Sequence, residues 1–133
     1  MDKQPLGMRN NNPLNIRKST QRYVGETISD NAFKKFKSIP YGIRAALMII
    51  HTYYFKYHLD TITKIITRWA PPNENDTKKY IETVAKRAHL NPDVKIIYIK
   101  DTILAIVKAM AYVECHVELS DKDLQEGWTL AQS

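Results

Sequence analysis

Apolar residues recur at helical spacing through most of the chain that follows Pro40. At about 100° of rotation per residue, this pattern predicts five helices, bounded by capping residues, prolines and turns. The expected ranges are 42–58, 61–70, 77–90 and 101–117, followed by a last helix that begins after Ser120. The expected N-caps are Asp60 with Thr61, Asn75 or Asp76, Asp101 with Thr102, and Ser120 with Asp121. The pattern therefore favours a mainly helical core.

The first 40 residues follow a different pattern of polar loops and one short run of strand-forming residues. Three asparagines precede Pro13, and Asn favours loops because its side chain bonds nearby backbone and tolerates left-handed conformations. Residues 23–37 predict a small β-hairpin with a turn near Asp30 and Asn31. We therefore expect a mainly α (α+β) fold in one domain, 1–133, with a loop and β-lobe at 1–40 and a helical lobe at 41–133.

Glu114 interrupts the apolar face of the helix expected at 101–117. It lies four residues after Met110, seven after Val107 and three before Val117. A buried glutamate is rare unless it is paired or used. Apolar neighbours and the nearby helix C-terminus both disfavour negative charge, so we expect a raised pKa. A carboxyl group that keeps its proton near neutral pH is suited to general acid catalysis, although Glu114 could instead reach solvent or pair with a Lys or Arg.

The composition adds a basic surface to this picture. The 133 residues include 20 Lys and Arg against 14 Asp and Glu, a formal net charge of +6. This charge favours an anionic partner, such as nucleic acid, a membrane surface or a cell-wall polymer. The single cysteine, Cys115, excludes an internal disulfide. The N-terminus lacks the apolar run of a signal peptide, and the longest apolar run, 45–50, is too short to cross a bilayer, so we expect synthesis in a cytoplasm and no membrane insertion.

The histidines, the glycines and the single cysteine do not form the pattern of a metal site, a phosphate-binding loop or a cysteine nucleophile. The four histidines show no metal-ligand spacing to Cys or to paired carboxylates, and four glycines are too few for a phosphate-binding loop. Cys115 and His116 are adjacent, but neighbouring helical residues do not face each other, which argues against a nucleophile and base pair. We therefore expect no metal and no cofactor.

Three segments, in this order, carry a resemblance to a known family. The first is GMRNNNPLNIR at 7–17, and the second runs from Tyr23-Val24-Gly25 to Tyr41-Gly42-Ile43-Arg44-Ala45. The third begins at Thr61, contains RWAPPNENDT at 68–77 and continues to Tyr80-Ile81. Together they resemble a family of small phage-associated proteins, often called virion structural proteins, that look like lysozyme-superfamily enzymes cleaving peptidoglycan. The likeness covers nearly the whole chain, and RWAPPNENDT is its most specific part.

The resemblance implies a lysozyme-like domain whose segments are circularly permuted. In lytic transglycosylases and glucosaminidases, a helix ending in a Glu-Ser-Gly type motif precedes an Asn-Asn-x-x-Gly-Ile type segment. Here the similar segment at 11–16 comes first, and the helix ending in Val113-Glu114-Cys115-His116 comes last. On this mapping Glu114 takes the place of the catalytic acid. Two departures are the bulkier Cys115 and His116 where small residues are expected, and Leu14 where the phage family has glycine, which would matter if that position needs a positive φ.

Cleavage of a glycosidic bond requires a proton for the leaving oxygen and stabilisation of an oxocarbenium-like centre. On the resemblance, Glu114 supplies the proton. A second carboxylate, if one is used, comes from the β-lobe, where Glu26 and Asp30 are the candidates. Glu26 could instead be a solvated edge charge, and Asp30 could cap the hairpin turn. Without a second carboxylate a transglycosylase route remains, in which the substrate's own groups assist and Glu114 acts first as acid and then as base.

Candidate substrate contacts come from asparagine and tyrosine side chains. The asparagines could hydrogen-bond sugar hydroxyl or N-acetyl groups or could stabilise their own loop, and they are Asn11, Asn12 and Asn15. Tyr23 and Tyr80 could stack on sugar rings. By contrast, Trp69 lies on an apolar helical face and is assigned to the core, and the carboxylates within 74–77 are assigned to N-capping.

Two functions follow from the resemblance. The first is cleavage of the peptidoglycan glycan strand, as lytic transglycosylase or muramidase, with Glu114 as general acid and base. The alternative is a non-catalytic structural or glycan-binding virion or effector protein that retains the fold. The implied partners are glycan strands and components of a virion or secretion system, and nucleic acid is not expected. The protein would act in the periplasm or cell wall after lysis or delivery, or within a virion. A groove beside the 11–17 loop, into which Glu114 opens, would favour the first function.

Overall fold

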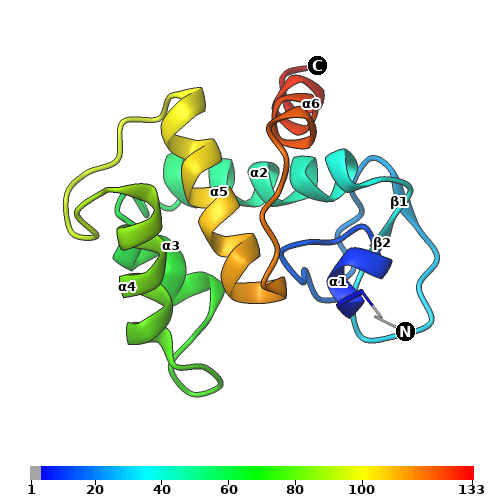
Figure 1. The fold of residues 1–133 in the computed structure, drawn as a ribbon, viewed down its shortest axis with the longest axis horizontal. Helices are drawn as coiled ribbons and strands as arrows, with labels where there is room; N and C mark the ends of the chain where they lie inside the picture. Colours follow the sequence, from blue (N-terminus) through cyan, green and yellow to red (C-terminus); the bar gives the residue numbers. More distant parts are fainter. Residues whose placement is uncertain (1–3) are drawn as a thin grey trace.

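The computed structural model describes residues 4–133, and in this part of the chain it is mainly helical with a small antiparallel hairpin (Figure 1). The helices are α1 (Leu6–Arg9), α2 (Ile39–Phe55), α3 (Ile62–Trp69), α4 (Thr77–Ala88), α5 (Lys100–Cys115) and α6 (Asp121–Gln132). The strands are β1 (Glu26–Thr27) and β2 (Lys35–Phe36). The expected fold class is therefore confirmed. The division into lobes at residue 40 stays a prediction, and residues 1–3 of the first lobe lie outside the described part.

Most helix starts agree with the expected caps. The side chains of Thr61, Asp76 and Ser120 accept hydrogen bonds from the backbone N–H three residues later, as N-caps do. The start of α5 was predicted wrongly, because Ile99 is its N-cap and Asp101 lies in the first turn. A carboxylate is also favourable there, since it faces the positive end of the helix dipole. The sequence pattern missed α1, whose four residues are too few to show a helical period.

The hairpin is short and is extended by the loop that precedes it. β1 and β2 pair antiparallel, with Glu26 opposite Phe36 and Thr27 opposite Lys35. The N–H of Lys34 donates to Ile16 O at 2.9 Å, so the chain after the 11–15 loop runs beside the hairpin. The turn is fixed at Asn31, whose side chain accepts from the N–H of Phe33 at 2.9 Å. The predicted turn region is thus confirmed.

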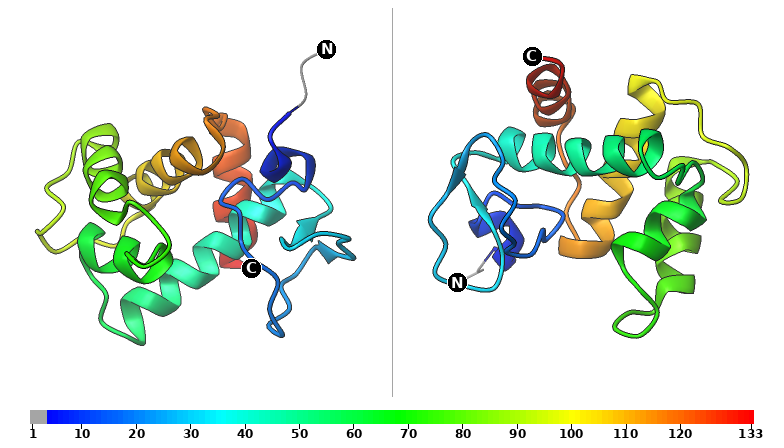
Figure 2. Two further views of the ribbon diagram at one scale, coloured as in Figure 1. Left: turned by 90° about the horizontal axis from the view of Figure 1, so that it is seen from below. Right: turned by 180° about the vertical axis from the view of Figure 1, so that it is seen from behind.

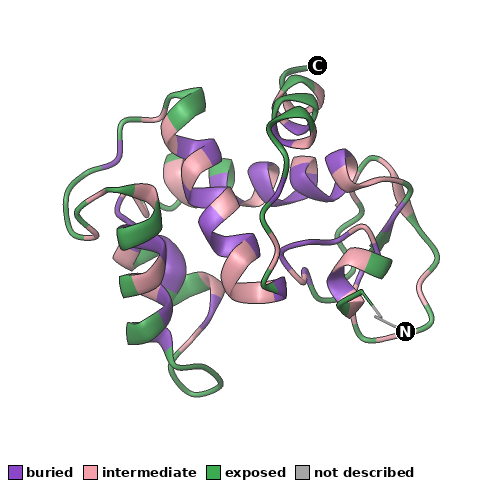
Figure 3. Cartoon of the chain, in the orientation of Figure 1, coloured by how far each residue is buried: buried purple, intermediate pink, exposed green. Residues whose placement is uncertain are grey.

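The longer helices surround one apolar core at the centre of the molecule (Figures 1 and 3). α5 crosses α2 and packs against α4, and α6 packs across the outer side of α2 at a steep angle (Figures 1 and 2). The fully buried side chains come mainly from α2, α3 and α5, including Ile50, Ile65 and Met110. Between residues 4 and 133, no helix combines the length and hydropathy needed to cross a membrane. α1 and the first loop lie beside the C-terminal end of α5, and this contact builds the site.

Candidate active site

The last turn of α5 carries Glu114 and is held against the N-terminal segment. The helix ends at Cys115, and the C-cap residue His116 adopts the left-handed conformation (φ 54°) and donates its N–H to Tyr112 O at 2.8 Å. α1 approaches this turn very closely. A Cβ atom added at Gly7 would lie 2.4 Å from Cys115 Sγ and 2.6 Å from Asn15 Oδ1. Glycine is therefore required at position 7, because any side chain would separate the first loop from α5.

Two side chains from distant parts of the chain hold the Glu114 carboxyl group. The hydroxyl of Tyr80, on α4, donates to Oε2 at 2.8 Å. Asn15 Nδ2 donates to Oε1 and to the backbone carbonyl oxygen of Glu114, both at 3.2 Å. Asn15 reaches this position because its own backbone is left-handed, with a φ of 53°. The carboxyl group is thus oriented from both sides before any ligand arrives.

Burial raises the pKa of Glu114 above its usual value, as expected from the sequence. Hydrogen bonds from Tyr80 and Asn15, the side chain of Trp69 and the positive charge of Arg17 act in the opposite direction without cancelling the effect of burial. The group therefore holds its proton more strongly than an exposed glutamate. When the proton leaves, Tyr80 and Asn15 already donate hydrogen bonds to the carboxylate that remains. These are properties of a group that gives and takes back a proton.

Glu114 opens into a groove of about 320 Å³ beside the 11–17 loop. The loop contributes Asn15 and Arg17, and the hairpin region contributes Phe33. The other lining residues come from α2, from the end of α3 and from the segment that follows it, and they include Ile49, Tyr53, Trp69, Pro71, Glu74 and Asn75. The rings of Tyr53 and Trp69 meet edge to face, with centroids 6.4 Å apart. The groove therefore combines polar groups with aromatic faces, as sugar-binding sites require.

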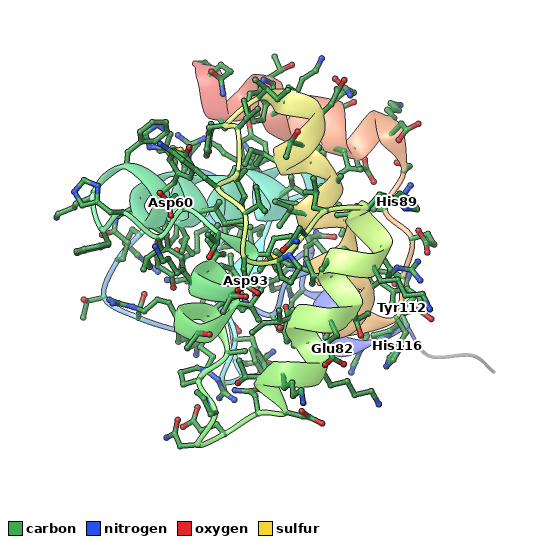
Figure 4. All side chains as sticks on the ribbon, turned by 90° about the vertical axis from the view of Figure 1, so that its left-hand side faces the viewer. Asp60, Glu82, His89, Asp93, Tyr112 and His116 are labelled. Carbon is green, nitrogen blue, oxygen red and sulfur yellow. The ribbon has the colours of Figure 1, made fainter. Side chains whose placement is uncertain are left out.

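Two further cavities adjoin this groove and lengthen it. One, of about 390 Å³, shares Asn75 and Glu114 with the groove and continues to Tyr112 and His116. These two side chains lie close together at the end of α5 (Figure 4), with ring centroids 5.7 Å apart. The other, of about 450 Å³, shares Ile49 and Tyr53 with the groove. Glu114 thus lies where two of three adjoining cavities meet, an arrangement suited to an extended polymer.

Glu26 does not line this groove or the two adjoining cavities. Its carboxylate accepts from Lys34 Nζ at 3.1 Å and from Arg22, and the Lys34 side chain is only 1% exposed. Burial acts to raise the pKa of Glu26, but the bonds from Lys34 and the Tyr23 N–H, with the nearby positive charges, outweigh it and lower the pKa. The prediction of Glu26 as a catalytic residue is therefore not supported. It is not a solvated edge charge either, because it neutralises a buried lysine.

The three asparagines divide between loop and site. Asn12 is fully buried, and its side chain bonds the backbone of Ile16 and Lys34 at 2.9 Å, so it stabilises the loop and is closed to substrate. Asn11 donates to Phe36 O at 2.9 Å from a left-handed backbone. Asn15 alone of the three lines the groove. For Asn11 and Asn12, the loop-stabilising alternative fits the structure.

The two tyrosines have different surroundings. Tyr80 is buried, with its hydroxyl bound to Glu114, so it positions the acid, and it also lines the second cavity. Tyr23 is half-buried and lines the third cavity, beside Tyr53. Trp69 was assigned to the core, but it is half-buried and lines the groove, because α3 ends there and the prolines turn the chain away. Its position at a helix end, just before Pro71-Pro72, is the sequence signal that could have identified Trp69 as a groove residue.

Two residues that departed from the family pattern fit their positions. Leu14 is fully buried and is not among the residues with positive φ, a role taken by its neighbours Asn11 and Asn15. Glycine is therefore not required at position 14. Burial raises the pKa of Cys115 to about 11, so its thiol is protonated and packs against Gly7. Among residues 4–133, no group of three or more His, Cys, Asp or Glu is arranged to hold a metal ion.

No family model matches the chain. Protein P5 of Pseudoalteromonas phage PM2 is 41% identical to it over 113 residues, which cover 81% of this chain and 69% of the phage protein. The chain belongs to the family of this phage protein. The phage part of the resemblance seen in the sequence is thereby confirmed. Its lysozyme-like part stays a prediction.

Proposed function

We propose that this protein is a component of a phage particle and that its groove binds and cleaves the glycan strand of peptidoglycan. The relationship to Protein P5 of phage PM2 supports the first part. The second part rests on one observation: a half-buried Glu114 with a raised pKa lies at the meeting point of two cavities in an extended groove. A lysozyme-like domain with permuted segments is the fold that this proposal implies.

In the proposed reaction, a strand occupies the groove with the glycosidic oxygen of the scissile bond facing Glu114. The protonated carboxyl group donates its proton to that oxygen as the bond to the sugar breaks. The resulting carboxylate is stabilised by the Tyr80 hydroxyl and the Asn15 amide, which already face its two oxygens. Glu114 then takes a proton back, either from a substrate hydroxyl that closes an anhydro ring or from an attacking water.

The choice between these two endings depends on a second carboxylate. Glu74 is the other carboxylate among the groove-lining residues, and it is exposed on the loop between α3 and α4. Asp30 is exposed in the hairpin turn and does not line the groove. Because Glu74 is not oriented by a buried partner, we favour the transglycosylase ending, in which the substrate's own hydroxyl attacks. Loss of hydrolysis in Glu74→Gln would instead indicate that Glu74 acts as the base.

A second candidate is a non-catalytic virion protein that binds glycan or serves only in assembly. The relationship to a phage protein supports this role as well, because a role in the assembly of a particle requires no enzymatic step. In addition, both Glu114 oxygens already have partners inside the protein, as a purely structural carboxyl group would. His116, which follows the acid where small residues are expected, lines the second cavity beside Glu114. The two candidates differ in one respect that can be measured, which is bond cleavage.

The deciding experiment is digestion of purified peptidoglycan from several bacteria, followed by mass spectrometry of the products. The wild type should release anhydro-muropeptides, and Glu114→Gln should reduce the rate by about 10² to 10⁴, the usual contribution of a general acid. Glu126→Gln, an exposed glutamate on α6, is the matched control and should retain full activity. Binding without any released product would establish the non-catalytic role. Immunodetection in purified virions of a phage that encodes this chain tests the particle location.

A further inference from the structure

A second surface, outside the lining of the groove, exposes apolar side chains at the end of α2 and on the loop before α5. We call Phe55, Ile97 and Ile99 the apolar surface. Ile97 is 71% exposed, Ile99 53% and Phe55 52%. Val94, on the same loop, is also exposed. Large apolar side chains grouped in this way on a surface mark an interaction site.

The apolar surface is held rigidly by the residues beneath it. The Tyr98 ring lies 5.0 Å from Phe55 and 5.1 Å from Tyr54, between centroids. The Tyr54 hydroxyl donates to Ile96 O at 2.7 Å, and Ile96 is buried. The loop therefore turns Ile96 and Tyr98 inward and leaves Ile97 and Ile99 facing solvent. Ile97 and Ile99 project from an anchored loop.

Lysines outnumber unpaired carboxylates around the apolar surface. Segments 51–58 and 94–100 contain Lys56, Lys95 and Lys100 and no acidic residue, and these three exposed lysines make no ion pair within residues 4–133. Of the flanking carboxylates, Asp60 pairs with Lys64 at 3.3 Å, and Asp93 accepts from the Thr63 hydroxyl at 2.8 Å (both are labelled in Figure 4). Asp101 lies in the first turn of α5, where it is exposed and makes no ion pair within residues 4–133.

We propose that the apolar surface docks the protein peripherally on an anionic lipid bilayer. Aromatic and aliphatic side chains favour the boundary between headgroups and acyl chains, and each nearby lysine gains from the negative phosphates. A protein partner could also cover apolar side chains, but the three unpaired lysines outnumber the two exposed aspartates without an ion pair, Asp93 and Asp101, which favours an anionic surface. Docking leaves the groove free, because Phe55 and the groove residue Tyr53 point about 160° apart around α2.

The test is co-sedimentation with vesicles of phosphatidylglycerol and phosphatidylethanolamine, compared with vesicles of phosphatidylcholine alone. The wild type should bind the anionic vesicles and leave the neutral ones, with binding that weakens as salt is raised. Lys95→Gln should weaken binding about fivefold, and Ile97→Ser roughly tenfold. Ile28→Ser and Lys35→Gln are matched controls from the N-terminal segment, at the opposite end of the longest axis (Figure 1), where Ile28 is 89% exposed.

Circular dichroism and thermal unfolding of each variant confirm that a loss of binding is not a loss of fold. The proposal is wrong if the folded wild type stays in the supernatant with anionic vesicles. It is equally wrong if the control variants lose as much binding as Ile97→Ser and Lys95→Gln. Sedimentation equilibrium adds one more outcome: if Ile97→Ser dissociates a dimer while vesicles are not bound, the surface joins two copies of this chain instead. Neither the wild-type vesicle result nor the variant series depends on whether the groove cleaves glycan.

Discussion

Asn15 and Glu114 are 99 positions apart in the sequence, yet the Asn15 amide donates to both the side chain and the backbone of Glu114 at 3.2 Å. The first loop and the last turn of α5 therefore act as one unit. Because Asn15 also lines the groove, a change at either residue alters both the acid and its surroundings. The following predictions separate the contributions of each partner.

Replacing Glu114 should change how stability depends on pH. Its pKa is raised in the folded protein, so between the ordinary and the raised pKa the folded state binds more protons than the unfolded state. The free energy of unfolding of the wild type should therefore fall as pH rises through that window. Glu114→Gln lacks this dependence and should gain stability relative to the wild type as pH rises from the ordinary pKa of a glutamate through the raised pKa of Glu114. Urea unfolding at several pH values measures the difference, and parallel curves would contradict the prediction.

Tyr80→Phe should raise the pKa of Glu114 further. The Tyr80 hydroxyl stabilises the carboxylate form, so its removal favours the protonated form. In a catalytic protein the limb of the pH–rate profile that reports the acid should move to higher pH. Titration of the Glu114 carboxyl carbon by nuclear magnetic resonance gives the same information without activity. Tyr112→Phe is the control, since Tyr112 lines the neighbouring cavity without bonding Glu114.

Asn15 can be tested for its backbone and its side chain separately. Asn15→Ala loses the bonds to Glu114 and also forces a Cβ-bearing residue without a compensating side chain into the left-handed region, at a cost of about 1–3 kcal/mol. Asn15→Gly loses the same bonds without the backbone strain and should be less destabilised. Both should show the same altered Glu114 titration. Equal unfolding free energies in the two variants would show that the backbone conformation contributes nothing.

Glu26→Gln should reduce stability while leaving any groove activity of the folded protein unchanged. The substitution leaves Lys34 buried without a counter-charge, which costs about 3–5 kcal/mol. Since the pKa of Glu26 is lowered by folding, its contribution in the wild type is present above the ordinary pKa and is lost as pH falls. Glu26→Gln should therefore weaken the acid dependence of unfolding. Lys34→Met combined with Glu26→Gln should recover part of the loss, whereas a specific loss of activity would restore Glu26 as a catalytic candidate.

Trp69 offers a direct probe of binding in the groove. The chain has two tryptophans, so in Trp128→Phe the fluorescence reports Trp69 alone. Glycan fragments should change the intensity or the wavelength of that emission, because a sugar ring against the indole excludes water. Tyr53→Ala removes the neighbouring ring and should weaken binding of the fragments by roughly five- to tenfold, or about 1–1.5 kcal/mol. An unchanged spectrum at saturating fragment would place the ligand elsewhere.

Local signals predicted the helices well because each depends on residues close together in the sequence. Thr61, Asp76 and Ser120 cap their helices through hydrogen bonds that span three residues. Pro71 and Pro72 follow the end of α3 at Trp69, because proline cannot continue the hydrogen bonding of a helix. The apolar neighbours of Glu114 follow the same helical period, so its burial and raised pKa could also be predicted. Asp101 misled the prediction of the α5 start because a carboxylate is favourable both at the N-cap and in the first turn.

The groove and the roles of individual residues depend on contacts between segments that no local pattern describes. Nothing near Glu26 in the sequence indicates that Lys34 is buried beside it, and nothing near Asn12 indicates that its side chain is fully bonded within the loop. Trp69 looked like a core residue because helical spacing shows which face is apolar and not where that face ends. The sequence by itself determined the elements and the unusual acid. Only the tertiary structure decided which side chains meet that acid, because hydrogen bonds require a distance and an angle that packing alone sets.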